Sequence, residues 1–257
     1  MTGKTPSTVS FVGSGPGDPE LITVKGMRLL EKADVVVYAG SLVKEKVLKY
    51  CREGTEIHNS ASMHLEEIMS VVVSAAKAGK AVVRLHTGDP SLYGALREQT
   101  EVLDAEGVPY EVVPGVSSAF ASAAALKKEL TMPGVTQTVI FTRLEGRTPV
   151  PESERLSALA VHNATVCVFL SASMIDRVVE ELKKGYPPDT PAAVVYRATW
   201  EDEKTVTGTL EDIASKTKAE GISRHALIIV GRAIGEDAPG NASLLYDKDF
   251  KHGYRKK

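Results

Sequence analysis

Two glycine-containing turns are the stretches of this sequence whose residues best suit ligand chemistry. The first, GSGPGDP at 13–19, follows a short apolar run and places glycines at alternate positions. The second, TGDPSLYGA at 87–95, follows the apolar run AVVRLH. Glycine lets the main chain come close to a bound molecule, whose polar atoms can then pair with main-chain N–H and C=O groups. These turns are therefore the first candidates for a ligand site.

The first turn does not fit a phosphate-binding motif. The dinucleotide fingerprint is Gly-x-Gly-x-x-Gly, whereas this turn reads Gly-x-Gly-x-Gly and contains Pro16, which has no N–H. Asp18 would place negative charge beside a diphosphate, and the following apolar strand, ending VYAGS, carries no carboxylate to bind a ribose. No Gly-x-x-x-x-Gly-Lys-Ser/Thr sequence occurs. The sequence therefore disfavours a dinucleotide or a nucleoside triphosphate.

Metal and covalent chemistry lack a sequence signature. The six histidines are scattered, and Cys51 and Cys167 lie far apart without metal-ligand spacing. No Gly-x-Ser-x-Gly sequence is present, so a serine-hydrolase function has no support. We expect no metal site, and the sequence singles out no catalytic residue or general base.

Composition restricts the class of protein. The chain has 257 residues, 31 basic and 33 acidic, with a formal net charge of −2, which gives no sign of a nucleic-acid-binding surface. No apolar run approaches the length of a membrane span, and the amino-terminal residues lack the apolar segment of a signal peptide. With only two cysteines, the sequence predicts a cytoplasmic protein with no membrane partner.

Apolar and amphipathic runs alternate through the first 115 residues, and predict a parallel sheet covered by helices on both faces. The expected strands are at 8–13, 34–39, 54–60, 80–90 and 109–115. The expected helices are at 19–33, 42–51, 64–79 and 91–107. Ligands of such sheets bind beyond the carboxyl ends of the strands, where both glycine turns fall.

A segment rich in small residues, 116–134, is the candidate crossover to a second domain. Beyond it we expect strands at 138–143, 165–171, 190–199, 203–210 and 225–234, and helices near 153–161, 174–186 and 211–220. We therefore divide the chain into an N-terminal α/β domain at 1–116, a C-terminal α/β domain at 117–235 and a polar tail at 236–257, whose basic end has no assigned role.

Five segments together resemble the tetrapyrrole methylase family: VGSGPGDPELITVKGMRLLEKADVVVYAGSLV, HTGDPSLYGA, VVPGVSSAFASAAA, TRLEGRTPVPE and VVYRATWEDEKTVTGTL. The resemblance covers about residues 8–234, and MHLEE, HTGDP and TRLEGRTPVPE are typical of its C-11 branch. It implies the class III methyltransferase fold, with two α/β domains, a mostly parallel first sheet and a mixed second sheet. It also implies a homodimer.

The resemblance implies S-adenosylmethionine as cofactor, bound in a cleft between the domains and released as S-adenosylhomocysteine. This cofactor has no phosphate, which agrees with the first turn. Carried over by position, the cofactor contacts are Pro16, Thr87, Gly88, Asp89, Leu92, Ser117, Ser118, Leu170, Ala198 and Ala226. Structural roles stay open: the glycines could serve a tight strand–helix turn, Pro16 could simply mark the turn, and Asp89 could cap a helix at 91.

The implied reaction is methylation of carbon C-11 of precorrin-4 or cobalt-precorrin-4, in the formation of the corrin ring of cobalamin. Because the sulfonium is already a good methyl donor, the enzyme needs mainly to position the reactants. The substrate carries many carboxylates, so we expect arginines to bind it. The candidate substrate contacts are Met63, Tyr93, Arg143, Arg147 and Arg197. Core filling by Met63 and solvated arginines are the structural alternatives.

Two other functions stay open. Relatives in the family methylate other precorrin carbons, uroporphyrinogen, a modified histidine or ribosomal RNA, so the substrate could differ. A protein of another class, a catalytically silent sensor of an adenosine ligand, would bind S-adenosylmethionine without turnover. An assay of methyl transfer to a panel of precorrins separates these functions.

Overall fold

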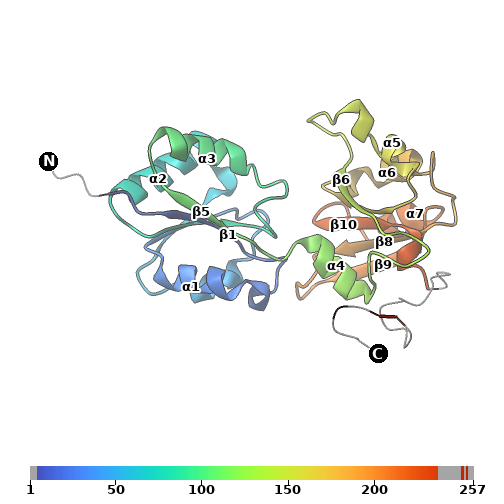
Figure 1. The fold of residues 1–257 in the computed structure, drawn as a ribbon, viewed down its shortest axis with the longest axis horizontal. Helices are drawn as coiled ribbons and strands as arrows, with labels where there is room; N and C mark the ends of the chain where they lie inside the picture. The colour runs from blue at the N-terminus through green and yellow to red at the C-terminus, as the bar shows by residue number, and fades with distance from the viewer. Residues whose placement is uncertain (1–4, 237–249, 252, 254–257) are drawn as a thin grey trace. The chain divides into compact units, whose positions relative to one another are not determined.

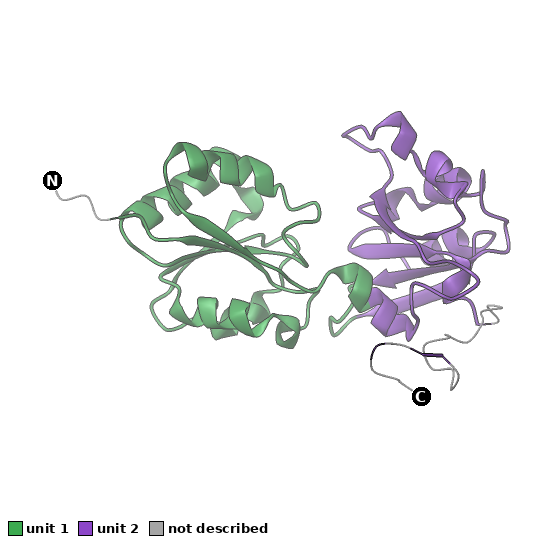
Figure 2. Ribbon diagram, in the orientation of Figure 1, with its two compact units in different colours: residues 1–121, 197–202 green, residues 122–196, 203–257 purple. Residues whose placement is uncertain are grey.

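The computed structural model describes residues 5–236, 250, 251 and 253. The chain forms two compact units (Figure 2). Unit 1 comprises 1–121 together with 197–202, and unit 2 comprises 122–196 together with 203–257. The sequence places the boundary at 116 and does not anticipate that 197–202 belongs with the first unit. The predicted polar tail at 236–257 lies largely outside the described residues.

Unit 1 is built on a five-stranded sheet with the order β3-β2-β4-β1-β5, in which every neighbouring pair is parallel. Its central strands are short, Val-rich and buried, as strands covered on both faces must be. The strands are β1 (Val9–Gly13), β2 (Val35–Tyr38), β3 (Glu56–Asn59), β4 (Val82–His86) and β5 (Tyr110–Val113). The prediction of a mostly parallel first sheet is confirmed.

Helices cover both faces of this sheet (Figure 1). On one face α2 (Leu65–Lys77) and α3 (Leu96–Ala105) pack against a cluster that includes Phe11 and Leu103. On the other face α1 (Val24–Lys32) and the 3₁₀ helix η2 (Glu45–Tyr50) pack against a cluster that includes Leu30 and Leu85. Unit 1 also contains η1 (Pro19–Leu21) and η3 (Ser60–Ser62), and α4 (Ser118–Leu126) begins in it.

Unit 2 contains a mixed sheet with the order β6-β7-β10-β8-β9, in which only β6 and β7 are parallel neighbours. Its helices α5, α6 and α7 contribute to a single large apolar cluster with the sheet. The strands are β6 (Val139–Arg143), β7 (Thr165–Phe169), β8 (Pro191–Tyr196), β9 (Lys204–Thr209) and β10 (Ala226–Val230). The helices are η4 (Glu152–Glu154), α5 (Leu156–Ala160), η5 (Ala172–Met174), α6 (Ile175–Leu182), α7 (Ile213–Ala219) and η6 (Arg232–Ile234). The predicted mixed second sheet is confirmed.

Three predicted helices of unit 1 differ from the observed ones. The segment 42–51 forms the 3₁₀ helix η2 and not an α-helix. The helix expected at 19–33 is divided, because Thr23 is extended and caps α1 through a bond from the Gly26 N–H to its hydroxyl. The helix expected from residue 91 begins only at Leu96, because the backbone before it is left-handed at Tyr93 and Ala95.

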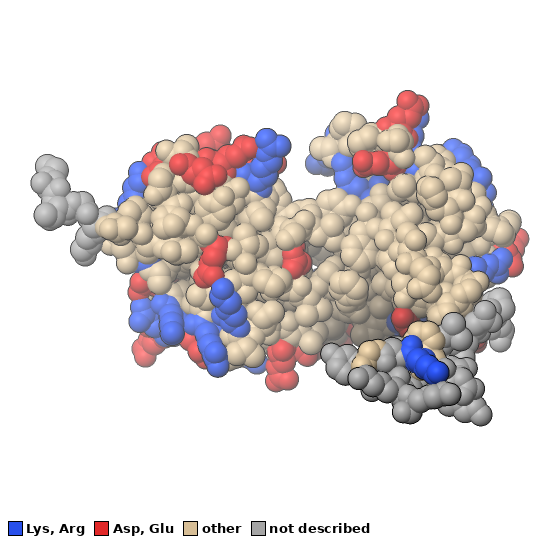
Figure 3. All heavy atoms as spheres, viewed as in Figure 1, with Lys and Arg blue, Asp and Glu red and all other residues tan. Residues whose placement is uncertain are grey.

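The surface carries mixed charge. In the space-filling view, basic and acidic side chains both occur on the visible face of each unit, in small groups separated by wide uncharged stretches (Figure 3). Within the described residues, no helix has the length and apolarity needed to cross a membrane.

Candidate functional site

The two glycine turns of the sequence meet at the carboxyl-terminal edge of the sheet in unit 1. Gly15 and Gly88 form an isolated antiparallel bridge, in which Gly88 N donates to Gly15 O over 2.9 Å and Gly15 N donates to Gly88 O over 3.3 Å. Ser14 N also donates to His86 O over 2.7 Å. The ends of β1 and β4 are therefore joined main chain to main chain, at the edge where parallel sheets bind ligands.

The end of β5 approaches the same two strands so closely that side chains are excluded. A Cβ atom added to Gly13 would lie 2.6 Å from Gly88 O and 2.7 Å from the Cα of Gly115. A Cβ atom added to Gly115 would lie 2.1 Å from Gly88 O. Glycine is required at both positions because real Cβ atoms do not come this close to main-chain atoms. Gly88 itself has a φ of +58°, which also favours glycine.

Asp89 braces the turn after β4. One of its carboxylate oxygens accepts from Ser91 N over 2.8 Å and the other accepts from Gly115 N over 2.9 Å. The capping alternative holds only in part, because α3 begins at Leu96 and Asp89 instead caps the turn at 90–92. The second bond ties the turn after β4 to the turn after β5, so Asp89 fixes the shape of the site.

The segment Arg197–Asp202, which returns to unit 1 from the loop between β8 and β9, closes over the first glycine turn. The indole nitrogen of Trp200 donates to Pro16 O over 2.9 Å, and the Thr199 hydroxyl accepts from Asp18 N over 2.9 Å. A Cβ atom on Gly17 would lie 2.1 Å from the Trp200 ring. Asp18 in turn accepts from Glu20 N over 2.9 Å, at the start of η1. Asp18 therefore has a structural task that explains its place in the turn.

Charged side chains surround Trp200. The ammonium of Lys44 lies 5.3 Å from the centre of its ring, and the guanidinium of Arg197 lies 5.0 Å from it. Lys44 and Lys46 both pair with Glu201, and their hydrogen bonds lower the pKa of Glu201 to about 2. Arg197 pairs with Asp202 over 2.6 Å. These contacts hold the returning segment on unit 1 with cation–π and ionic interactions.

Buried polar side chains lie under the turn after β4. Arg84 and His86 project from alternate positions of this strand, and only 6% and 5% of their surfaces are exposed. Burial lowers the pKa of Arg84 to about 10. Burial, together with the nearby charge of Arg84, lowers the pKa of His86 to about 3, so the imidazole is neutral at neutral pH. The Nε2 atom of His86 has no hydrogen-bond partner in the described part of the chain.

Most predicted cofactor contacts lie in unit 1 near these turns. Ser117 is buried and accepts from Ala119 N over 3.3 Å, and Ser118 is the first residue of α4. Thr87 is half-buried, and its hydroxyl donates to Leu42 O over 3.4 Å. The structure therefore groups in unit 1 the predicted residues Pro16, Thr87, Gly88, Asp89, Leu92, Ser117, Ser118 and Ala198.

Two of the predicted substrate contacts in unit 1 differ in exposure. Tyr93 is 46% exposed, on the turn that precedes α3. Met63 follows η3 at the end of β3 and packs against the apolar cluster on the α2 side of the sheet. Met63 therefore packs in the core, as the structural alternative for this residue expects. Its role toward a substrate stays a prediction.

The predicted contacts of unit 2 gather at one edge of the second sheet. Leu170 directly follows β7, and Ala226 opens β10, the antiparallel neighbour of β7. Arg143 ends β6, which is parallel to β7 and pairs with it through Phe169. Leu170 is 63% exposed and has a φ of +54°, an uncommon conformation for a residue with a side chain. Their binding roles stay predictions.

The segment TRLEGRTPVPE folds around Arg143. The guanidinium donates to Thr148 O over 3.2 Å and to Pro149 O over 2.8 Å, so its charge is directed into its own loop. Arg147, on the same loop, is exposed and has no ion-pair or hydrogen-bond partner among the described residues. Of the two arginines, Arg147 is therefore the one whose donors stay available to a ligand.

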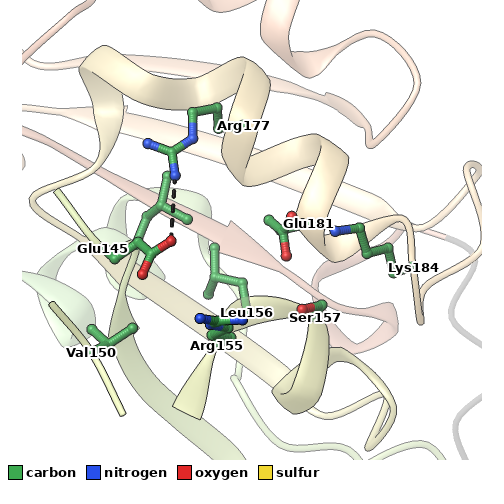
Figure 4. A pocket seen from close by; sticks show the side chains of 9 residues that line it. Glu145, Val150, Arg155, Leu156, Ser157, Arg177, Glu181 and Lys184 are labelled. Carbon is green, nitrogen blue, oxygen red and sulfur yellow. Dashed lines mark hydrogen bonds and ion pairs between the residues drawn. The ribbon is translucent and has the colours of Figure 1, made fainter. Parts of the chain in front are cut away.

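A hollow of about 220 Å³ lies beside this loop in unit 2 (Figure 4). Its charges are paired: Arg177 with Glu145 over 3.7 Å and Lys184 with Glu181 over 2.5 Å. The lining residues are Leu144, Glu145, Val150, Arg155, Leu156, Ser157, Arg177, Glu181 and Lys184. Because the cations already have carboxylate partners, this hollow offers little net attraction to an anion.

Within the described ranges, no group of three or more His, Cys, Asp or Glu side chains could hold a metal ion. Both cysteines are free, and burial raises the pKa of the Cys167 thiol to about 12. Burial also raises the pKa of the Cys51 thiol. Neither sulfur is therefore an activated nucleophile.

Sequence reasoning missed four residues that shape the site: Trp200, Gly115, Arg84 and Gln99. Trp200 acts on a turn 184 residues away, so no local pattern reveals its contact. Gly115 follows a valine-rich run in VVPG, and its need for glycine arises only when three strand ends meet. The one available signal was a charged residue, Arg84, within an otherwise apolar strand.

Comparison with known proteins agrees with this geometry. Residues 8–214 match the family described as Tetrapyrrole (Corrin/Porphyrin) Methylases. A relative from Methanocaldococcus jannaschii, a cobalt-precorrin-4 C(11)-methyltransferase, is 59% identical over 96% of both chains. The solved structure of a cobalt precorrin-4 methyltransferase is similar, with a TM-score of 0.87, 49% identity and coverage of 89% of this chain and 96% of the other.

A second solved structure adds a ligand-bound example. It is a uroporphyrin-III C-methyltransferase from Thermus thermophilus complexed with S-adenosyl homocysteine. The two chains share 32% identity with a TM-score of 0.72, and the match covers 89% of this chain and 93% of the other. From its family match and its full-length relatives, this chain belongs to the tetrapyrrole (corrin/porphyrin) methylase family.

Proposed function

We propose that this protein transfers the methyl group of S-adenosylmethionine to carbon C-11 of precorrin-4, or of its cobalt-bearing form, in cobalamin ring synthesis. The observation that carries the proposal is the 59% identity, over 96% of both chains, to a cobalt-precorrin-4 C(11)-methyltransferase. A second family member, 46% identical over 96% of this chain, is a precorrin-4 C(11)-methyltransferase from Pseudomonas aeruginosa, so both forms of the substrate belong in the proposal.

The turns of unit 1 fit the cofactor. A bound adenosine and an amino-acid group need nearby main-chain donors and acceptors and little side-chain bulk. A Cβ atom on Gly88 would meet Ser117 Cα at 3.7 Å and Ser118 N at 3.9 Å, which are ordinary van der Waals distances, so neighbouring main chain does not crowd this position. Gly13 and Gly115 also lack side chains, which allows the ends of β1, β4 and β5 to lie close together next to Gly88. The likeness to a methyltransferase complexed with S-adenosyl homocysteine supports the same cofactor.

In this proposal the polar groups of two predicted contacts, Asp89 and Pro16, bond to the protein itself and not to the cofactor. Both oxygens of Asp89 are used on main-chain N–H groups, so Asp89 shapes the turn that the cofactor meets. The carbonyl of Pro16 is taken by Trp200, which leaves its ring as the part that can touch a ligand. Thr87, Leu92, Ser117, Ser118 and Ala198 are the other proposed contacts of this unit, with Leu170 and Ala226 proposed in unit 2.

Bound S-adenosylmethionine would supply an electrophilic methyl group on a positively charged sulfur. In the overall reaction a carbon–carbon bond forms at the ring as the carbon–sulfur bond breaks, the electron pair stays on sulfur, and the ring loses a proton. The protein's task is then to orient the two reactants, which can contribute on the order of 7–11 kcal/mol.

We assign substrate binding to exposed cations and one aromatic side chain. Arg147 is the strongest candidate because it has no partner in the described part of unit 2. Arg143 and Arg197 are weaker candidates because their donors already serve Pro149 O and Asp202. Tyr93 is exposed enough to lie against the face of a macrocycle.

We also propose that the protein is a cytoplasmic homodimer that takes no nucleic-acid partner. Phe120 on α4 is 58% exposed, and apolar surface of this kind is common at subunit interfaces. The free state of both cysteines agrees with a reducing compartment. Light scattering on the purified protein tests the assembly, since a monomeric mass at micromolar concentration contradicts the dimer.

The function is tested by supplying the purified protein with S-adenosylmethionine labelled with carbon-13 in the methyl group. Precorrin-4 and cobalt-precorrin-4 are offered separately, and the expected product of one or both gains a single labelled methyl, located at C-11 by NMR. Label at another ring carbon would show that the protein methylates that carbon and not C-11. Calorimetry that shows cofactor binding with no transfer to any precorrin would support the silent sensor instead.

A further inference from the structure

Arg84 is a buried cation whose partners are all neutral. Only 6% of its surface is exposed, yet it forms no ion pair with a carboxylate in the described ranges. Its Nε donates to the Gln99 side-chain oxygen over 2.9 Å, and its Nη1 donates to Val37 O over 3.2 Å. A buried charge is unfavourable unless hydrogen bonds compensate it, and an apolar side chain of similar volume would serve packing as well. Arg84 therefore calls for a specific role.

Gln99, which accepts from Arg84, also donates hydrogen bonds to the main chain that precedes α3. Its side-chain nitrogen donates to Ala95 O over 2.9 Å and reaches Gly94 O at 3.5 Å. Gln99 is itself 3% exposed. A continuous buried chain of hydrogen bonds thus runs from the central strand β2, at Val37, through Arg84 and Gln99 to the turn.

The turn that receives this support has an uncommon backbone. Tyr93 has a φ of +55° and Ala95 a φ of +46°, both in the left-handed region that disfavours residues with a Cβ atom. Gly94, between them, approaches Pro90 O so closely that a Cβ atom would lie 2.3 Å from it. Left-handed residues with a side chain persist only where surrounding contacts fix them, and they are concentrated at functional sites. No side chain caps the free N–H groups of α3 at Ala95, and the bond from Gln99 to Ala95 O is a separate contact that holds the main chain at this position.

We propose that Arg84 and Gln99 are positioning residues, which hold the Tyr93–Ala95 turn, left-handed at Tyr93 and Ala95, and so present Tyr93 to the tetrapyrrole. The inference rests on the proposed function, in which Tyr93 contacts the substrate. Neither Arg84 nor Gln99 touches the substrate, since both are buried beneath the turn. The pair would act on binding and orientation of the ring and leave the cofactor turns at Gly15 and Gly88 unchanged.

Two substitutions separate this role from simple packing. Arg84→Met removes the guanidinium at similar volume. Gln99→Glu keeps an acceptor for Arg84 and gives it a carboxylate partner, but removes the donor to Ala95 O, so the fold is retained while the turn loses its support. Arg97→Met is the matched control, because Arg97 is exposed on the same helix and its one hydrogen-bonded ion pair within the described residues is with Glu101.

The measurements are hydrogen exchange of the segment 90–97, S-adenosylhomocysteine affinity by calorimetry, and KM and kcat for the tetrapyrrole. For Gln99→Glu we expect roughly tenfold faster exchange in this segment, a KM raised roughly tenfold with a smaller change in kcat, and cofactor affinity within about twofold of wild type. Arg97→Met should match wild type in all three. Arg84→Met should follow Gln99→Glu if it folds.

Unchanged exchange in a folded Gln99→Glu protein overturns the proposal, and so does faster exchange with unchanged KM and kcat. An equal loss of tetrapyrrole binding and cofactor binding would also overturn it, since the effect would not be local to the turn. If wild-type protein methylates no precorrin at all, the proposed function fails, whereas the exchange measurement still reports whether the pair holds the turn.

Discussion

The indole nitrogen of Trp200 donates a hydrogen bond to the carbonyl of Pro16 over 2.9 Å, across 184 residues of sequence. This bond holds the first glycine turn at Pro16, while Gly88 holds it at Gly15 through two main-chain hydrogen bonds. Trp200 is also the only tryptophan of the chain. A natural fluorescent reporter therefore lies against the turn that we propose to meet the cofactor.

Trp200→Phe should weaken both the turn and cofactor binding. Loss of one hydrogen bond to a partly buried carbonyl should lower the free energy of unfolding by about 1–2 kcal/mol. In wild-type protein, titration with S-adenosylhomocysteine should change the tryptophan fluorescence, and calorimetry should show weaker binding by the variant. Unchanged affinity in a folded Trp200→Phe protein would mean that the returning segment does not support the cofactor site.

Gly115→Ala tests the close approach of the three strand ends. The new methyl group would lie 2.1 Å from Gly88 O, so the turn after β4 must move. We expect a loss of at least about 2 kcal/mol in unfolding free energy and weaker S-adenosylhomocysteine binding by roughly tenfold or more.

Gly146→Ala is the control for this substitution, since a Cβ atom there meets only the Met174 methyl group at 3.6 Å. Its unfolding free energy should stay within about 0.5 kcal/mol of wild type, with cofactor affinity unchanged. If both alanine variants keep the stability and cofactor affinity of wild type, the close approach of the three strand ends is not needed for either property.

His86 should make the protein less stable in acid. Its folded pKa of about 3 lies below the ordinary value of 6.5, so between these pH values the unfolded chain binds a proton that the folded protein does not. Stability then falls as pH falls, and the loss between pH 7 and pH 5 should be about 2 kcal/mol from this group. Urea denaturation at both pH values should show a smaller loss for His86→Asn than for wild type. Equal losses would show that His86 does not remain neutral on acidification.

Two arginines of one loop should behave differently. Arg147→Ala should raise the KM for the tetrapyrrole roughly tenfold with little change in stability, because its guanidinium has no partner in the described residues. Arg143→Ala should loosen the loop 144–149, whose carbonyls it binds, and increase protease sensitivity there. Unaltered substrate affinity in Arg147→Ala would remove Arg147 from the proposed site.

Local patterns predicted most of the elements that position the site. The strands of unit 1 were predictable because buried parallel strands are continuous apolar runs, such as VVVY in β2. The class III fold and the mixed second sheet followed from the resemblance alone. The start of α3 was misplaced because the residues Ser91–Ala95 have helical composition, yet Tyr93 and Ala95 adopt left-handed backbone. Gln99 and Asp89 bond to this segment, and each is itself tied to a residue farther away in the sequence, Arg84 and Gly115, which no local pattern reveals.

The candidate site was predictable only in part. The positions of Gly88 and Asp89 could be read from their turn, but one of the two bonds of Asp89 is to Gly115, which the sequence places 26 residues away. The contact of Trp200 with Pro16 depends on a return of the chain that no periodicity encodes. Long-range main-chain contacts of this kind follow from the assembled sheet and not from any local segment.

Because 197–202 belongs to unit 1, each unit is encoded by two separate stretches of the gene. The chain leaves unit 1 after residue 121, re-enters it at 197 and leaves again after 202. An expression fragment that stops at Ala121 would lack the indole that caps Pro16 and the hydroxyl that binds Asp18 N. Such a truncation would not reproduce the contacts that hold the first glycine turn, and recombination that exchanges whole halves between relatives would have to carry this hexapeptide along with the amino-terminal half.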